Sequence, residues 1–179
     1  DLYLVCVRDA AGLGRAVGYA RAKGIQLVNH SASWFNPGRG DGAGAVGTPE
    51  GIVAAARAAG ILWVNAAGNR AQQHWSGSFV DSNANGWSEY APGDEGNTVV
   101  VPAGTFFCAA LKWDDWPSSA EDYDLYLTRS RGGGIVSGSN GPQTGLEPPT
   151  ELACAINRAT TTVTYAIGIK AHNVTGKPI

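Results

Sequence analysis

The hydrophobic and polar residues of the first half of the chain alternate between strand-like and helix-like patterns. Apolar runs at 2–7 ("LYLVCV"), 25–30 and 61–65 predict strands, and the continuous run at 2–7 predicts one that is buried on both faces. Between them, residues 10–23 and 50–59 repeat their apolar positions at helical spacing. The succession strand–helix–strand–helix–strand with short connections predicts a parallel, doubly wound α/β sheet.

The expected helices carry recognisable end signals. Thr48-Pro49-Glu50 combines a hydroxyl cap, a proline at the first helical position and an acid in the first turn. Gly24 and Gly60 stand where the two helices should stop. Both helices are therefore bounded by the sequence itself.

The second half has a different character. Residues 70–96 are polar, glycine-rich and aperiodic, and only strand signals follow, separated by Gly, Pro, Asn or Ser clusters. In "DYDLYL", Tyr123, Leu125 and Leu127 should share one face, opposite a face with two aspartates. We expect a partial α/β domain over 1–96, including the irregular loop, and a small antiparallel β-sandwich over 97–179. The fold class is thus α/β plus all-β.

Composition narrows the classes of partner. The formal net charge of −2, with 44% hydrophobic and 16% charged residues, gives no reason to expect nucleic acid or an anionic membrane surface as a partner. No apolar stretch is long enough to span a bilayer. The absence of methionine, and a beginning inside an expected strand, indicate an excised fragment of a longer protein.

The three cysteines are too few for a disulfide scaffold. Cys6 lies in an apolar run and is expected to be a core residue. Cys108 and Cys154 lie in two expected strands and would pair in a secreted protein, although sequence alone leaves both states open.

The segment "GILWVNAAGN" (60–69) ends a hydrophobic strand with a small-residue turn and one amide side chain. In an open parallel sheet, ligands bind at the carboxyl ends of the strands, where Asn69 and the preceding Gly68 fall. A fixed, neutral amide there can donate to a developing oxyanion. The alternative is that Asn69 only occupies a left-handed turn, which asparagine tolerates well.

The segments "AVGYARAKGIQLVNHSAS" and "GIVAAARAAGILWVNAAGN" together resemble the central part of subtilisin-like serine peptidases, over roughly residues 3–75. In that family, one strand leads to a Ser-Leu-Gly-like segment that pairs with substrate. The next strand leads to a turn that carries the oxyanion-hole asparagine. The resemblance implies that Ser31, Ala32 and Ser33 pair with a peptide or protein substrate and that Asn69 is the oxyanion donor. Ala32 and Ser33 stand where the family usually has Leu and Gly.

The family's catalytic Asp, His and Ser motifs are missing from these 179 residues. His30 falls inside a strand, His74 follows the oxyanion turn, and Ser139 lies in a turn between strands, so none of the three is expected to be catalytic. The missing residues would precede Asp1 and follow Ile179. The chain alone should then be inactive, with no cofactor required.

In residues 81–89 ("DSNANGWSE"), the first six residues match the first six positions of a calcium loop. Asp81, Asn83 and Asn85 would supply oxygen ligands and Glu89 a further carboxylate, although an Asn/Gly-rich loop without metal explains the same composition. Further acids, at 114–115 and in "DYDLYL", fit either a second calcium site or a solvated strand face. The latter segment loosely resembles β-sandwich domains of secreted bacterial peptidases.

The sequence therefore predicts a fragment of a secreted subtilisin-like endopeptidase with an inserted β-sandwich. The alternative function is a non-catalytic module that binds protein or glycan. In that case Trp113, Trp116 and Tyr126 would either stack on sugars or form the core.

Overall fold

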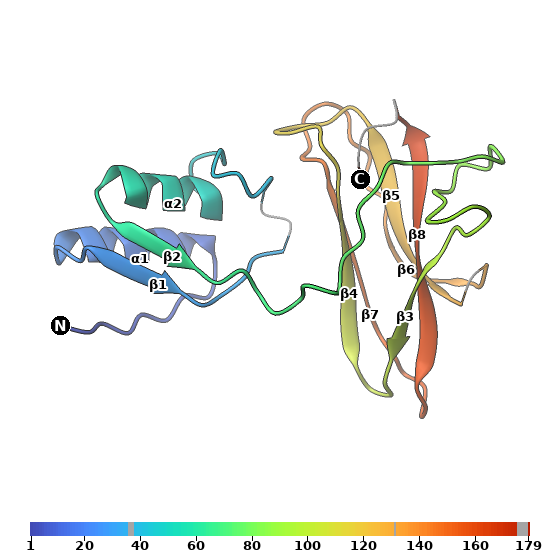
Figure 1. Ribbon diagram of the computed structural model, residues 1–179, viewed down its shortest axis with the longest axis horizontal. Coiled ribbons are helices and arrows are strands. Elements are labelled where there is room, and N and C mark those ends of the chain that lie inside the picture. Colours follow the sequence, from blue (N-terminus) through green and yellow to red (C-terminus); the bar gives the residue numbers. More distant parts are fainter. Residues whose placement is uncertain (36–37, 131, 175–178) are drawn as a thin grey trace. The chain divides into compact units, whose positions relative to one another are not determined.

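The computed structural model describes residues 1–35, 38–130, 132–174 and 179. It is mostly β-sheet with two helices, and it divides into two compact units, Asp1–His74 and Trp75–Ile179. The division falls at His74 rather than after residue 96, so most of the irregular loop belongs to the β-rich unit (Figure 1). Each unit is described by itself below.

The first unit contains a two-stranded parallel sheet and two helices (Figure 1). Its elements are α1 (Ala10–Ala22), β1 (Leu27–His30), α2 (Pro49–Ala58) and β2 (Leu62–Asn65). The register pairs Leu27 with Leu62 and His30 with Asn65. The parallel order of these elements is as the sequence predicts. A two-stranded parallel sheet is common to many folds, however, and a subtilisin-like sheet stays a prediction.

The helix boundaries follow the signals in the sequence. Thr48 accepts a hydrogen bond from the Gly51 N–H at 3.2 Å, as a helix cap does. Gly24 (φ +66°) and Gly60 (φ +80°) reverse the chain after the two helices, a conformation that favours glycine. The next residue in each case returns a hydrogen bond to the helix that it leaves, Ile25 to Ala20 and Ile61 to Ala56.

One expected strand is absent. Residues 2–7 form no strand, and Leu2 and Leu4 are 98% and 100% exposed. A continuous apolar run becomes a buried strand only where a neighbouring strand and a covering layer are present. Cys6 is exposed too, rather than a core residue as expected.

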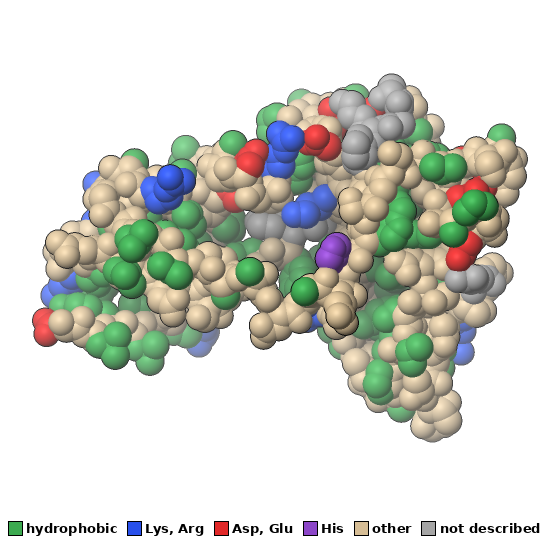
Figure 2. All heavy atoms as spheres, viewed as in Figure 1, with side chains coloured by type: hydrophobic (Ala, Val, Ile, Leu, Met, Phe, Trp, Pro, Cys, Tyr) green, Lys and Arg blue, Asp and Glu red, His purple; other side chains and the backbone are tan. Residues whose placement is uncertain are grey.

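The core of the first unit lies on one face of the sheet. Leu13, Val17 and Ala20 of α1 pack with Ile52 and Ala56 of α2. From the sheet, Val28 and Trp63 join this core, so both helices cover the same face. The opposite face is bare: Leu27, Leu62 and Val64 are 55%, 60% and 46% exposed. Hydrophobic side chains reach the surface of both units in Figure 2.

The second unit consists of two antiparallel sheets (Figure 1). The four-stranded sheet has the order β3-β8-β5-β6, and the two-stranded sheet pairs β4 with β7. The strands are β3 (Asn97–Val101), β4 (Phe106–Lys112), β5 (Asp122–Arg129), β6 (Ile135–Ser139), β7 (Thr150–Ile156) and β8 (Val163–Asn173). These confirm the strands expected from residue 97 onward.

The two sheets share one hydrophobic core. Tyr123, Leu125 and Leu127 of β5 are at most 1% exposed, which confirms their expected common face. They pack with Leu111 and Trp113 from the β4 side, and with Ala109, Ala153 and Ile169. Trp113 is thus a core residue at 2% exposure and does not form part of a stacking surface.

The irregular loop before β3 is fastened to β8. Ser88 N–H donates to the Ile169 carbonyl and Ala171 N–H to the Gly86 carbonyl, both at 2.8 Å. Trp87 forms a bridge with Lys170 just beyond the stretch of β8 that β3 pairs with. The loop therefore continues the sheet where β3 is absent, and this explains why it belongs to the β-rich unit.

Candidate functional site

The carboxyl ends of β1 and β2 form the candidate site of the first unit. His30 and Asn65 end the two strands in register, and the Ala66 N–H extends the ladder to the His30 carbonyl at 3.1 Å. Residues 31–33 follow β1 and residues 66–69 follow β2, so both segments start from this same end of the sheet. The parallel ladder thus starts both expected site segments side by side.

Ser31, Ala32 and Ser33 are exposed and belong to no strand. No backbone hydrogen bond of these three residues is found within the part of the chain that the structure describes. A segment whose N–H and C=O groups face solvent is free to pair with an added strand. Their backbone therefore suits the substrate-pairing role that the resemblance implies.

Asn69 follows Gly68, which has φ +86°. Asn69 is exposed, and its amide has no hydrogen-bond partner among the described residues. The left-handed residue of this turn is thus the glycine, while the asparagine keeps a free donor. A free neutral amide is the group that an oxyanion site needs.

A cluster that the sequence did not predict lies beside these segments. His30 Nδ1 and Asn65 Oδ1 are 2.6 Å apart, and Asn65 Nδ2 donates to the Ala66 carbonyl at 2.8 Å. Because the amide oxygen faces His30, the hydrogen-bond network assigns the proton to Nδ1. The His30 ring stacks on Trp34, with 6.3 Å between ring centroids, and meets Trp63 at a tilt, with 5.5 Å between centroids. The sequence signal for this cluster was that His30 and Asn65 are each the last residue of an expected strand.

No hydrolytic triad forms among the described residues. His30 bonds to Asn65 and His172 to Asp124, and neither bonds to a serine. Ser139 lies in β6, where its hydroxyl contacts the Glu151 carboxylate. His74 is exposed.

The expected calcium loop is closed by hydrogen bonds of its own. Both carboxylate oxygens of Asp81 accept backbone N–H groups, from Asn85 at 3.1 Å and from Gly86 at 2.8 Å. The Glu89 carboxylate accepts hydrogen bonds from the Ser82 hydroxyl and from the Gly93 N–H. These bonds lower the pKa of Glu89 below its usual value, and the bond from the Ser82 hydroxyl has the largest effect. Glu89 is thus held by its own neighbours in the loop.

Glu95, which sequence reasoning missed, meets the amides instead. Its Oε1 accepts from Asn83 Nδ2 at 2.9 Å and from Asn85 Nδ2 at 2.7 Å. The described residues contain no group of three His, Cys, Asp or Glu side chains placed to hold a metal ion. A cation here would require both amides to turn their oxygens inward, toward Asp81 and Glu95. Calcium binding by this loop stays a prediction.

The outer face of β5 carries a polar and aromatic group. Asp124 is only 4% exposed, and its Oδ2 lies 2.6 Å from the Tyr126 hydroxyl and 2.7 Å from His172 Nε2. The hydrogen bond to Asp124, with burial and further carboxylates, raises the pKa of Tyr126 to about 12. This aspartate is a buried, hydrogen-bonded group rather than part of a solvated face.

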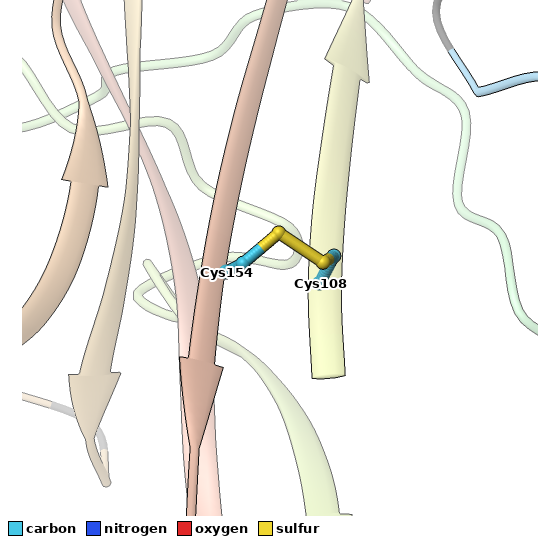
Figure 3. Close-up of a disulfide and its surroundings, with 2 residues drawn as sticks. All are labelled: Cys108 and Cys154. Atoms are coloured by element: carbon cyan, nitrogen blue, oxygen red, sulfur yellow. A yellow bond between two sulfur atoms is a disulfide. The ribbon is translucent and has the colours of Figure 1, made fainter. Parts of the chain in front are cut away.

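Cys108 and Cys154 form a disulfide between β4 and β7 (Figure 3). They are direct partners in the antiparallel register, which places their side chains on the same face. The state that the sequence left open is therefore the paired one.

Comparison with models of known protein families, with curated proteins and with solved structures finds no match to this chain. None of the helices in the described ranges is long and apolar enough to cross a membrane.

Proposed function

We propose that residues 1–179 are part of a secreted subtilisin-like serine endopeptidase. The chain would supply the oxyanion donor and the substrate-pairing segment, and other segments of the protein would supply the nucleophile and its base. The single observation that carries the proposal is that β1 and β2 end in register, so that segment 31–33 and the turn with Asn69 both follow from the same end of the parallel sheet. Neither the backbone of 31–33 nor the Asn69 amide has a hydrogen-bond partner among the described residues.

The chemistry would be acyl transfer from a peptide to a serine, followed by hydrolysis. As the serine oxygen bonds to the peptide carbonyl carbon, the carbonyl oxygen gains negative charge, and Asn69 Nδ2 would donate a hydrogen bond to it. A substrate strand paired with residues 31–33 would hold the scissile bond in place. The disulfide supports the secreted location, since disulfides persist in oxidising compartments.

Labelling with a fluorophosphonate probe tests this function. The 179-residue chain should remain unlabelled, because it lacks the activated serine. The natural protein that contains these 179 residues should be labelled stoichiometrically. Stoichiometric labelling of the 179-residue chain, or no labelling of the natural protein, would overturn the proposal.

A second function is glycan binding by the outer face of the four-stranded sheet. The Trp87 and Tyr126 rings lie there with centroids 5.5 Å apart, and Lys170 Nζ lies 5.7 Å from the Trp87 ring centroid. A side chain at Gly168 would come within 2.9 Å of the Trp87 ring, and one at Gly138 within 2.7 Å of the Tyr126 ring. Glycines on both neighbouring strands thus let the two rings lie close to the sheet.

Aromatic rings beside polar groups are suited to stacking on sugars. Retardation of the protein in gels containing soluble xylan or hydroxyethylcellulose tests this function. It should occur and be abolished by Trp87→Ala. If neither polysaccharide slows the migration of the protein, this face does not bind these glycans.

A further inference from the structure

A groove of about 400 Å³ opens in the second unit, beside the disulfide. Its walls come from both sheets: Phe106 of β4, Val136 and Ser137 of β6, and 154–156 of β7. Arg129, Arg158 and Tyr165 complete the lining. Neither the proposed catalytic chemistry nor the glycan face uses these residues.

The groove runs past two free strand edges. Cys154 and Ala155 are consecutive residues of a regular ladder and point to opposite faces of β7, yet both line the groove, so it passes the edge of this strand. On β6, Val136 and Ser137 line the groove at a β-bulge, where the pairing with β5 shifts by one residue. Both β6 and β7 are outermost strands of their sheets within the described part of the chain. Exposed strand edges offer unpaired N–H and C=O groups to an added strand.

The walls of the groove are apolar and exposed. Phe106 is 63% exposed, Ile156 42% and Val136 39%, and Ile156 lies directly across the β4–β7 ladder from Phe106. Apolar side chains that gather around a concavity mark an interaction site more often than scattered ones do. This surface is therefore suited to apolar side chains of a partner.

Two arginines add a positive charge to these walls. Arg129 and Arg158 are exposed, and neither side chain has a hydrogen bond or ion pair within the described residues. Segments 125–146 and 152–179 contain no Asp or Glu at all, whereas the acids of this unit lie in segments 81–95, 114–124 and 147–151. The groove thus combines free strand edges, an apolar wall and unneutralised guanidinium groups.

We propose that this groove binds an extended acidic peptide segment, with apolar side chains against Phe106, Val136 and Ile156 and carboxylates on Arg129 and Arg158. The peptide backbone adds along the edge of β6. A guanidinium group binds carboxylates through two parallel hydrogen bonds, which favours an acidic over a neutral or basic peptide.

A fluorescein-labelled hexapeptide of alternating glutamate and valine, measured by fluorescence anisotropy, tests the proposal. Binding should be saturable, and it should weaken as salt is added because part of it is electrostatic. Arg129→Gln and Arg158→Gln should each weaken it roughly tenfold, the loss of one charge-assisted contact. Both side chains are exposed and have no partner among the described residues, so these variants should fold normally.

Arg57→Gln, which changes an exposed arginine of α2, is the matched control and should leave binding unchanged. The hexapeptide with lysine in place of glutamate should not bind. Absence of saturable binding at millimolar peptide, equal binding of the lysine peptide, or an equal loss in Arg57→Gln would each overturn the proposal. Binding of decanoate that depends on both arginines, without binding of the peptide, would also overturn it and identify a small-molecule carboxylate site.

Discussion

His30 and Asn65 join the two parallel strands of the first unit at their carboxyl ends, with Nδ1 and Oδ1 2.6 Å apart. Asn65 bonds in addition to the carbonyl of Ala66, the first residue of the turn that leads to Asn69. This pair therefore fixes the point from which both expected site segments leave the sheet.

Asn65→Ala should loosen this end of the sheet. The loss of two side-chain hydrogen bonds near the surface costs about 1–2 kcal/mol of stability. Hydrogen exchange of the Ala66 N–H, which bonds to the His30 carbonyl, should accelerate. Asn29→Ala, at an exposed position of β1, is the control, and equal acceleration in both variants would contradict the role given to Asn65.

Reduction of the Cys108–Cys154 disulfide should destabilise the second unit. The bond joins residues separated by 46 positions, and closing a loop of that length stabilises by about 3–4 kcal/mol in the chain-entropy account. The urea midpoint of unfolding should fall in the Cys108→Ser/Cys154→Ser variant, and a reducing agent should have the same effect on the unmodified protein. Cys6→Ser is the control, because Cys6 forms no disulfide; an equal fall in that variant would contradict the assignment.

Alkaline pH should destabilise the second unit through Tyr126. Its folded pKa of about 12 lies above the ordinary value of 10, so its contribution is fully present below pH 10 and is lost as the pH rises toward 12. Tyr126→Phe should reduce the fall of the urea midpoint over this range. Asp124→Asn should reduce it as well, since the hydrogen bond to Asp124 is the first cause of the raised pKa. If the urea midpoint fell equally steeply with pH in both variants and in the unmodified protein, the role given to Tyr126 would be contradicted.

Calcium removal tests the loop that contains Asp81. If the loop binds the ion, the melting temperature should be higher in millimolar calcium than in chelator, because a ligand that binds only the folded state stabilises it. Glu95→Gln should abolish this difference, while Glu89→Gln should retain it, since Glu95 is the carboxylate that meets Asn83 and Asn85. Equal melting temperatures of the unmodified protein in both conditions would remove the calcium hypothesis.

Local signals in the sequence predicted most of the elements. Thr48-Pro49 marked the start of α2, Gly24 and Gly60 marked helix ends, and the alternation in β5 placed Tyr123 on one face with Leu125 and Leu127. These features depend on a few neighbouring residues, so a sequence pattern is enough to predict them.

What the sequence missed or left open concerns contacts between distant residues. Residues 2–7 have a strand-like pattern but no strand partner, and Glu95 reaches Asn83 from outside the motif that seemed to define the calcium loop. The pairing of Cys108 with Cys154 depends on the register of two strands. The meeting of His30 and Asn65 likewise requires the parallel ladder, which no local pattern specifies.

The decisive measurement for Asn69 is the turnover of a peptide substrate by the natural protein that contains these residues, compared with that of its Asn69→Ala variant. We expect kcat to be lower by roughly a hundred- to a thousandfold with KM little changed, a magnitude taken from subtilisin itself. Asn29→Ala should retain full turnover as the control. An Asn69→Ala variant with unchanged kcat would contradict the assignment of Asn69 as the oxyanion donor.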